Sequence, residues 1–241
     1  MRLRCRDLGT TGYQACWELQ RSLFEELLAR KTVAAGAAAH KIDAPDNSGD
    51  IGTVLLTEHE PVYTLGKSGH AENLLVNRTR LEELGARFFH IDRGGDITFH
   101  GPGQLVGYPI LDLERLGIGL RDYIDALEEC VIRTAGHYGV RAGRIAGASG
   151  VWIGGAATQE RSVPRKLCAV GVRSSRYVTM HGFALNVTTD LGWFAHINPC
   201  GFTDRGVTSL AAETGHAVGM QEVKELIVKH LSEILNVEIY K

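Results

Sequence analysis

The sequence lacks the features that mark several large classes of protein. No stretch approaches the ~20 consecutive apolar residues of a membrane-spanning helix, so none is predicted. The charge is nearly balanced, with 26 basic and 28 acidic side chains and a formal net charge of −2. Nucleic acids and anionic lipid surfaces attract proteins that concentrate positive charge. We therefore expect a protein that binds neither nucleic acid nor membranes.

Cysteine is scarce and irregularly spaced. There is no CxxC pair among the five cysteines, which argues against a disulfide framework and against a zinc site. The histidines form no close HxH or HxxxH pair, so a metal site built from them is not expected. The first seven residues lack the apolar segment of a secretory signal. These features predict a cytoplasmic protein.

Proline is also scarce, at 6 residues, whereas glycine is abundant, at 29 of 241. Glycine without proline indicates tight turns and close backbone contacts rather than a flexible linker. A chain of this length with 44% apolar and 22% charged residues can bury a substantial core. We expect residues 1–241 to form a single domain.

Hydrophobic periodicity predicts helices and strands that alternate along the chain. Helical spacing covers residues 13–28, 78–84, 120–138 and 221–235. Strand patterns cover residues 2–8, 52–57, 61–65, 87–92, 104–113, 150–153, 167–173, 178–187 and 237–240. Residues 33–50 are predicted as a helix end and a mobile loop, and 61–65 as the hairpin partner of 52–57. Strands in such pairs favour an α+β fold with a mixed sheet flanked by helices.

Four segments contain residues suited to catalysis. The loop 93–104 has four glycines and the side-chain donors Arg93, Thr98, His100 and Gln104, although tight turns also use glycine. It matches neither a Walker loop nor a dinucleotide fingerprint. Lys166 opens an apolar strand, where a solvated lysine is the commoner case. His181 precedes a glycine and is as readily a core histidine as a ligand.

Cys200 differs from the other cysteines because it lies in a Pro-Cys-Gly turn. Cys16 and Cys130 follow apolar helical stripes and are predicted as buried filler, Cys5 lies on a strand among arginines, and Cys168 lies in the strand of Lys166. A lone cysteine in a turn is more often inert than catalytic, unless a base or cation lies near it. A lysine ammonium beside the thiol would favour the nucleophilic thiolate.

Taken in order, these segments resemble the lipoyl(octanoyl) transferase family. The resemblance rests on residues 58–66, 93–104, 107–110, 150–152, Lys166, 181–186 and 198–201, which span roughly residues 50 to 210. It implies one catalytic domain over residues 1–241, with the fold of biotin and lipoate protein ligases and a small second sheet. It also implies the transfer of an octanoyl group from acyl carrier protein to a lysine of an apo lipoyl domain.

The resemblance further implies a role for particular residues. Cys200 would carry the acyl group as a thioester, and Lys166 would lower the pKa of that thiol or act as its base. The acyl chain would be bordered by Arg93, Gly94, Gly95, Asp96, Ile97, Thr98, Phe99, His100, Ala169, Val170, Gly171, Gly182, Phe183 and Ala184. Neither a cofactor nor a metal is implied.

The implied partners are octanoyl-acyl carrier protein as donor, and as acceptors the lipoyl domains of 2-oxoacid dehydrogenases and the glycine cleavage H protein. We expect a monomer that docks these acidic partners through arginines, of which the candidates are Arg2, Arg4, Arg6, Arg173 and Arg176. Two alternatives remain: an ATP-dependent lipoate or biotin ligase, and a non-enzymatic acyl-binding module.

Two features depart from the family pattern. The segments 33–50 and 155–165 are longer than expected, and the second either covers the site or is peripheral. Cys168 follows Lys166 by two residues, and residues at that spacing on a strand share a face. Cys168 is therefore a competitor for the role of Cys200.

Overall fold

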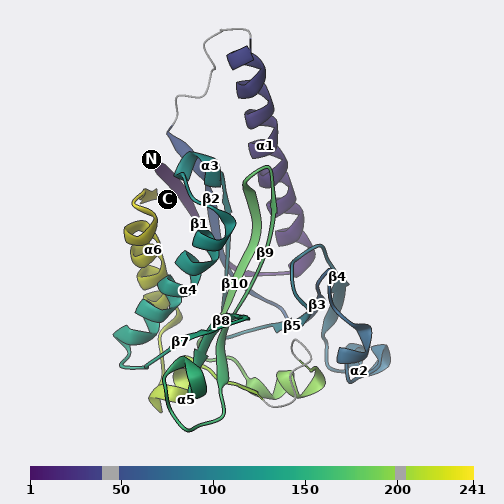
Figure 1. Ribbon diagram of the computed structural model, residues 1–241. Helices are drawn as coiled ribbons and strands as arrows, with labels where there is room; N and C mark the ends of the chain where they lie inside the picture. The colour runs from purple at the N-terminus through teal and green to yellow at the C-terminus, as the bar shows by residue number, and fades with distance from the viewer. Residues whose placement is uncertain (40–48, 199–204) are drawn as a thin grey trace.

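The computed structural model describes residues 1–39, 49–198 and 205–241, without the side chains of residues 34–39 and Arg78. The described chain forms a large sheet, a small sheet and flanking helices (Figure 1). No helix of these described residues is long and apolar enough to cross a membrane.

The large sheet has nine strands and mixed pairing. Eight strands form the continuous order, which is β12 (Glu238–Tyr240), β1 (Arg2–Thr11), β2 (Asp50–His59), β6 (Gln104–Leu111), β10 (Val178–Asn186), β9 (Arg165–Ser175), β8 (Ala148–Ile153) and β7 (Gly143–Ile145). The ninth strand, β11 (Gly206–Val207), pairs with the beginning of β9. β1 is parallel to both of its neighbours, whereas β6 is antiparallel to β2 and β10. The predicted mixed α+β fold is confirmed.

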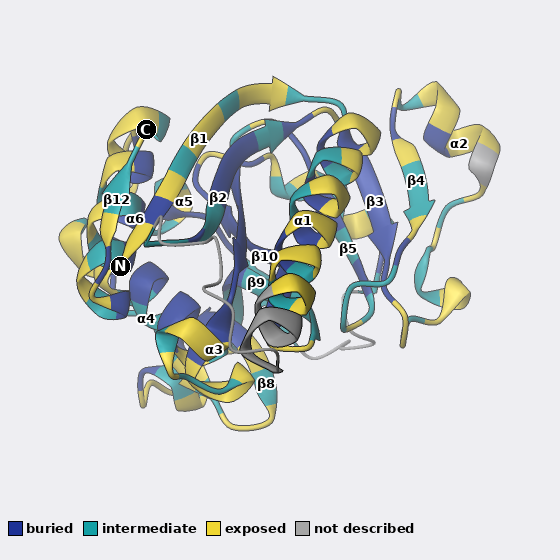
Figure 2. Cartoon of the chain, turned by 90° about the horizontal axis from the view of Figure 1, so that it is seen from above, coloured by how far each residue is buried: buried dark blue, intermediate teal, exposed yellow. Residues whose placement is uncertain are grey.

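Helices cover both faces of this sheet. Figure 2 shows α1 (Tyr13–Ala39) on one side of the buried central strands, with α4 (Leu120–His137) and α6 (Met220–Leu235) on the other. Cys16, Phe24 and Leu27 of α1 pack on β2, β6 and β10. The larger core lies on the opposite face, between the sheet and the apolar stripes of α4 and α6. Alternate residues of β6 and β10 therefore face two different cores.

The small sheet has the order β4 (Arg87–His90), β3 (Val62–Leu65) and β5 (Ile97–His100). It has its own core, to which α2 (Arg78–Glu83) contributes Leu81 and the 3₁₀ helix η3 (Leu191–His196) contributes Trp193 and Phe194. The remaining helices are short, and they are η1 (Ala71–Asn73), α3 (Leu113–Leu116), η2 (Gly155–Ala157) and α5 (Leu210–Thr214).

The predicted hairpin between residues 52–57 and 61–65 is wrong. β2 already pairs with β1 and β6 along its two edges, so neither edge is open to β3. Pro61 follows β2 and has no N–H to donate to a ladder. The chain instead turns into the small sheet, where β3 lies between β4 and β5.

Other boundaries also differ from the prediction. The first helix continues to Ala39, and residues 40–48 of the predicted mobile loop lie outside the described residues. The glycine-rich segment 93–104 contains a strand, β5, which its four glycines conceal. α3, α5 and β7 were not predicted, because elements of three to five residues carry little periodic signal.

The helix α4 provides a test of the larger core. Leu127 is fully buried between α4 and the sheet, so Leu127→Ala should lower the free energy of unfolding by about 3 kcal/mol. Leu75→Ala, at a residue that is 53% exposed, should change it by less than about 0.5 kcal/mol. Urea unfolding measures both. Equal values would contradict the packing described here.

Candidate functional site

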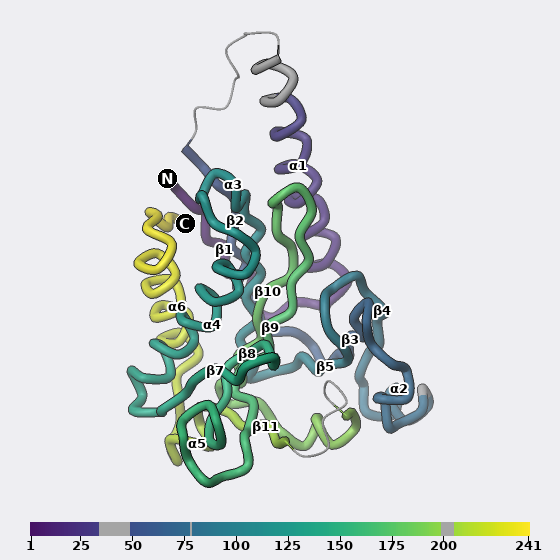
Figure 3. Tube along the Cα trace, viewed as in Figure 1, coloured from purple at the N-terminus to yellow at the C-terminus, as the bar shows by residue number. Residues whose placement is uncertain are grey.

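A cavity of about 460 Å³ lies between the small sheet, β6 and the β9–β10 hairpin. Figure 3 shows that hairpin beside α1, with the small sheet next to them. Every residue predicted to border an acyl chain lines this cavity except Phe99. The three separate segments 93–100, 169–171 and 182–184 are thus brought together.

Phe99 is the exception because it faces the other side of the small sheet. It is 1% exposed and its ring stacks on that of Trp193, with 5.0 Å between the ring centroids. Thr98 and His100 line the cavity from the same strand. The expectation that Phe99 borders the cavity is therefore corrected: it belongs to the core of the small sheet.

Small residues form the floor of the cavity. On β9 and β10, Ala169 pairs with Ala184 and Gly171 pairs with Gly182, so the four residues share one face. A Cβ on Gly171 would lie 2.9 Å from the carbonyl oxygen of Gly94. Glycine at 171 therefore lets the loop 93–96 approach β9, where the N–H of Gly94 donates to the carbonyl of Val172 at 3.1 Å.

Arg93 lines the cavity, but its guanidinium holds the loop together. Nη2 donates to the carbonyl oxygens of Asp96 at 2.7 Å and Thr64 at 3.2 Å, and Nη1 donates to that of Gly94 at 2.8 Å. Sequence reasoning treated Arg93 as a donor to a ligand. The structure shows it as the residue that fixes the shape of the glycine loop.

His100 is held by a chain of buried hydrogen bonds. The amide Nδ2 of Asn186 donates to the carbonyl of Thr208, so its Oδ1 accepts from Nε2 of Gln104 at 2.9 Å. Because Nε2 of Gln104 is turned toward Oδ1 of Asn186, Oε1 of Gln104 is turned toward His100 and accepts from its Nδ1 at 2.8 Å. Burial lowers the pKa of His100 to about 3, so its ring is neutral. Nε2 of this neutral ring consequently carries a lone pair.

Lys166 lies on the face of the sheet opposite Cys168. In the β8–β9 pair, Val151 lies opposite Cys168 and Trp152 lies opposite Lys166, which leaves Leu167 as an extra residue in β9. Such a β-bulge breaks the alternation of side chains. The expectation that the two residues share a face is wrong for this reason.

The surroundings of the two residues differ accordingly. Cys168 is fully buried in the larger core, and burial raises the pKa of its thiol far above the usual value. Lys166 is half-buried and lines the cavity. A nucleophilic thiolate therefore cannot form readily at Cys168. The predicted burial of Cys16 and Cys130 is confirmed.

An indole ring supports Lys166. Its Nζ lies 4.5 Å from the ring centroid of Trp152, and Cζ of Arg205 lies 5.3 Å from the same ring. Trp152 is 1% exposed, and a desolvated aromatic face attracts a cation more strongly than an exposed one. The ring thus attracts the ammonium group of Lys166 and holds it beside the cavity. The sequence gave no sign of this contact, because it depends on the bulge at Leu167.

Several other lining residues were not predicted. Tyr13, Val106 and Tyr108 line the cavity from α1 and β6. The signal for Val106 and Tyr108 was present in the alternation of residues 104, 106 and 108, which places all three on one face of a strand. No such signal pointed to Tyr13. Residues 155–165 do not line the cavity, so the long segment before Lys166 does not cover it.

Cys200 lies outside the described residues. Arg173 forms an ion pair with Asp92 and its guanidinium lies 5.0 Å from the ring centroid of Phe24, so it is engaged within the protein. Arg176 donates to the hydroxyl of Thr32.

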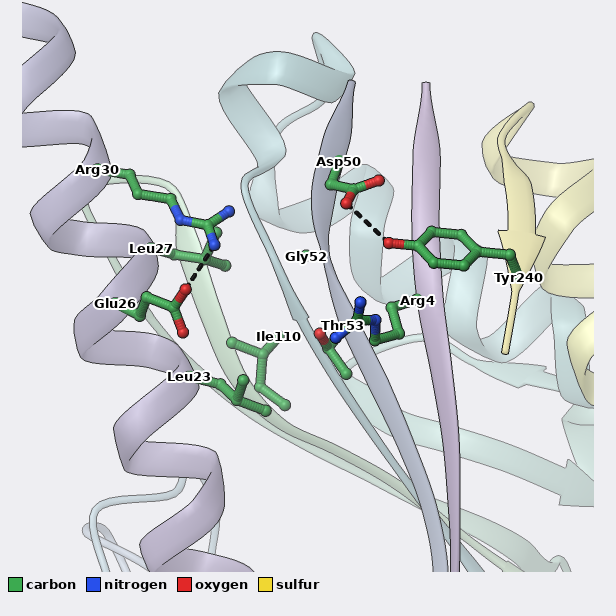
Figure 4. Close-up of a pocket in the computed structure, with 10 residues that line it drawn as sticks. All are labelled: Arg4, Leu23, Glu26, Leu27, Arg30, Asp50, Gly52, Thr53, Ile110 and Tyr240. Atoms are coloured by element: carbon green, nitrogen blue, oxygen red, sulfur yellow. Dashed lines mark hydrogen bonds and ion pairs between the residues drawn. The ribbon is translucent and has the colours of Figure 1, made fainter. Parts of the chain in front are cut away.

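A second cavity of about 130 Å³ lies between α1 and the strands β1 and β2 (Figure 4). Its charged lining groups include Arg30, which pairs with Glu26, and Asp50, which accepts from the hydroxyl of Tyr240. None of the predicted catalytic or acyl-bordering residues lines it. The described residues contain no group of three or more His, Cys, Asp or Glu side chains arranged to hold a metal ion.

Comparison with known proteins identifies the family. Residues 13–232 match the model of the lipoyl protein ligase A/B catalytic domain. Solved structures with the same fold include a bipartite lipoate protein ligase of Thermoplasma acidophilum (TM-score 0.67, 16% identity, 100% of this chain and 85% of that one) and a lipoate-protein ligase A bound with ATP (0.66, 15%, 100% and 87%). The chain belongs to the lipoyl protein ligase A/B catalytic domain family, as its fold and motifs predict.

Curated proteins that are similar to this chain include octanoyltransferases. The chain is 47% identical to that of Flavobacterium johnsoniae over 99% of this chain and 98% of the relative. It is 57% identical to that of Bacteroides fragilis over 74% and 79% of the two chains. A third, from Porphyromonas gingivalis, is 50% identical over 91% of this chain but only 42% of its own length. The predicted family is confirmed.

His59 contacts Tyr108 of the cavity wall, and its burial makes the free energy of unfolding depend on pH. It is fully buried, its Nδ1 lies 3.0 Å from the carbonyl of Thr11 and its Nε2 lies 2.7 Å from the hydroxyl of Tyr108. Burial lowers its pKa to about 4. The unfolded chain, with an ordinary value near 6.5, binds more protons between these pH values, so acidification favours unfolding.

We therefore expect the free energy of unfolding to fall between pH 6.5 and pH 4, with a contribution from His59 of up to about 3 kcal/mol. His59→Gln should make the fall shallower, and the same change at the exposed His216 should leave it unaltered. Urea unfolding at pH 7.5 and 4.5 gives both slopes. If His59→Gln leaves the slope unchanged, the pH dependence of stability comes from other groups and not from His59.

Proposed function

We propose that this protein transfers an octanoyl group from octanoyl-acyl carrier protein to a specific lysine of apo lipoyl domains, through a thioester on Cys200. The single observation that carries the proposal is the 47% identity to an octanoyltransferase over nearly the whole of both chains. The acceptors are the lipoyl domains of 2-oxoacid dehydrogenases and the glycine cleavage H protein. The enzyme acts in the cytoplasm as a monomer, in one catalytic domain over residues 1–241, without a cofactor.

The cavity has the shape and polarity for an acyl chain. Its floor of Ala169, Gly171, Gly182 and Ala184 leaves room above β9 and β10, and Val106 and Phe183 add apolar wall. Each buried methylene contributes about 0.8 kcal/mol, so the seven carbon atoms beyond the carbonyl contribute about 6 kcal/mol. This binding energy comes from the acyl group and not from either protein partner. The acyl group can therefore stay bound in the cavity while the donor leaves and the acceptor arrives.

The first half-reaction forms the thioester on the enzyme. The thiolate of Cys200 attacks the carbonyl carbon of the donor thioester, a C–S bond forms, and the C–S bond to the carrier breaks. The carrier thiol leaves with a proton that Lys166 can supply as an ammonium. A positive charge held on Trp152 next to the cavity supports this role, because it favours the thiolate before attack.

The second half-reaction forms the amide. The amine of the acceptor lysine attacks the carbonyl carbon of the enzyme thioester, a C–N bond forms, and Cys200 leaves again as a thiolate. The proton that the amine loses passes to Lys166, which the first half-reaction left neutral, and restores its ammonium. Exchange between thioesters is nearly isoenergetic, and aminolysis of a thioester is favourable, so no ATP is consumed.

The nucleophile can be tested by mass. Incubation with octanoyl-acyl carrier protein should add one octanoyl group to the protein, and Cys200→Ser should abolish the addition. Cys168→Ala is the matched control, because its thiol is buried in the core, and it should retain the adduct. An adduct that persists in Cys200→Ser, or that maps to Cys168, would overturn the assignment. Free octanoate with ATP should give no product.

The role of Lys166 can be tested through the pH dependence of thiol alkylation. Lys166→Ala should raise the midpoint pH for alkylation of Cys200 by about one to two units, because the neighbouring positive charge is lost. Lys229→Ala, at an exposed lysine of α6, is the control and should not move the midpoint. A midpoint that Lys166→Ala leaves in place would reduce the lysine to a structural role.

A further inference from the structure

The carboxylate of Asp96 makes its hydrogen bonds within the protein, although the residue lines the cavity. Oδ1 accepts from the backbone N–H of His70 at 3.1 Å and from that of Ile97 at 2.7 Å. Oδ2 accepts from Nδ2 of Asn73 at 2.5 Å. Both oxygens thus have partners, and two of the three donors belong to the short helix η1 and the residue before it. Asp96 therefore fastens η1 to the glycine loop.

The helix η1 is in turn attached to the segment that precedes the proposed nucleophile. The carbonyl of Asn73 accepts from the N–H of Asn198 at 2.8 Å. The two stretches of chain continue side by side through a further backbone hydrogen bond and an antiparallel bridge, which join residues 74–75 to 196–197. The chain as far as Asn198 is therefore held in place through Asp96.

The chain is also held on the other side of Cys200. Val207 pairs with Lys166, and the N–H of Thr208 donates to the carbonyl of Lys166 at 3.0 Å. Cys200 follows Asn198 by two residues, and two residues of chain span at most about 7 Å. Fixing Asn198 therefore limits the positions that are open to the thiol.

Asp96 is itself a fixed point. Its backbone carbonyl accepts from Nη2 of Arg93 at 2.7 Å and from the N–H of Gly66 at 3.3 Å. A Cβ on Gly69 would lie 2.7 Å from Oδ1 of Asp96, so glycine at 69 lets the neighbouring chain pass close to the carboxylate. Contacts to the backbone and to the side chain thus restrain the same residue.

We infer that Asp96 is a positioning residue for Cys200. Its hydrogen bonds to η1 fix the segment before the thiol, and so keep the thiol beside the ammonium group of Lys166. The inference rests on the proposed function, because it takes Cys200 as the nucleophile and Lys166 as its neighbour. A positive charge favours a thiolate only at close range. A segment released from η1 spends part of its time farther from Lys166, where more of the thiol stays protonated.

Two variants separate hydrogen bonding from charge. Asp96→Ala removes the charge and all three hydrogen bonds of the carboxylate. Asp96→Asn removes the charge alone, because its Oδ1 can accept from the two backbone N–H groups and its Nδ2 can donate to Asn73 once that amide turns over. Asn77→Ala is the matched control, because Asn77 also accepts from a backbone N–H, that of Arg80 at 2.9 Å, but caps α2 and not η1.

The experiment measures the midpoint pH for alkylation of Cys200, with the alkylated peptide identified by mass. Asp96→Ala should raise the midpoint by at least about 0.5 pH unit and slow adduct formation from octanoyl-acyl carrier protein about tenfold, because the thiol is no longer held. Asp96→Asn and Asn77→Ala should keep the midpoint within about 0.2 pH unit of the unaltered protein. Thermal melting confirms that each variant is folded. If Asp96→Ala does not fold, Asn73→Ala, which removes one of the three hydrogen bonds, should move the midpoint in the same direction.

A double variant distinguishes positioning from a general loosening of the fold. Once Lys166→Ala has removed the ammonium group, Asp96 has no charge against which to position the thiol. Adding Asp96→Ala should then leave the midpoint where Lys166→Ala alone puts it. A further rise would mean that Asp96 acts on the thiol independently of Lys166, and it would overturn the inference.

The possible failures are distinguishable. If the unaltered protein forms no octanoyl adduct, or if Cys200→Ser forms it equally well, the proposed function fails. If the adduct forms on Cys200 but Asp96→Ala leaves the midpoint in place, the inference about Asp96 fails alone. A lower midpoint in Asp96→Ala would also overturn it, because the carboxylate would then act on the thiol through its negative charge.

Discussion

A backbone hydrogen bond joins the loop of the small sheet to the large sheet, and the shape of the site depends on it. The N–H of Gly94 donates to the carbonyl of Val172, beyond the part of β9 that pairs with β8. The contact requires that Gly171 carry no side chain, since a Cβ there would meet the carbonyl of Gly94. The glycine loop, shaped by Arg93, thereby becomes one wall of the cavity, and the β9–β10 hairpin becomes its floor.

The bulge at Leu167 has a comparable effect at the other end of the cavity. It directs Cys168 into the core and Lys166 toward the cavity, although two residues separate them in sequence. Trp152, opposite Lys166 on β8, then lies under the ammonium group. One inserted residue thus buries the thiol of Cys168 in the core and places the ammonium group of Lys166 against an aromatic ring.

Much of this arrangement was predictable, and the failures have physical causes. The ordered motifs identified the family and the fold, because glycine-rich loops and short clusters of polar residues occur where the backbone takes a particular shape. Pairing of β2 with β3 was predicted wrongly, since local sequence cannot show that both edges of β2 are already occupied. Phe99 was assigned to the cavity from its place in a motif, whereas the alternation of β5 turns it into the core of the small sheet. The contact of Lys166 with Trp152 required knowledge of register, which a sequence read in isolation does not give.

The hydrogen bonds that run from Thr208 through Asn186 and Gln104 to His100 have one permitted direction. Reversing the tautomer of His100 would require both amide groups to turn over, and the carbonyl of Thr208 would then face an oxygen. Residues from three strands and a loop therefore fix the tautomer of His100. Its Nε2 can accept a hydrogen bond from a group in the cavity but cannot donate one. An incoming group that carries an N–H, such as an amine, can donate a hydrogen bond to this ring nitrogen. An incoming carbonyl oxygen cannot, because two acceptors repel each other, and the protein need not change shape to make the distinction.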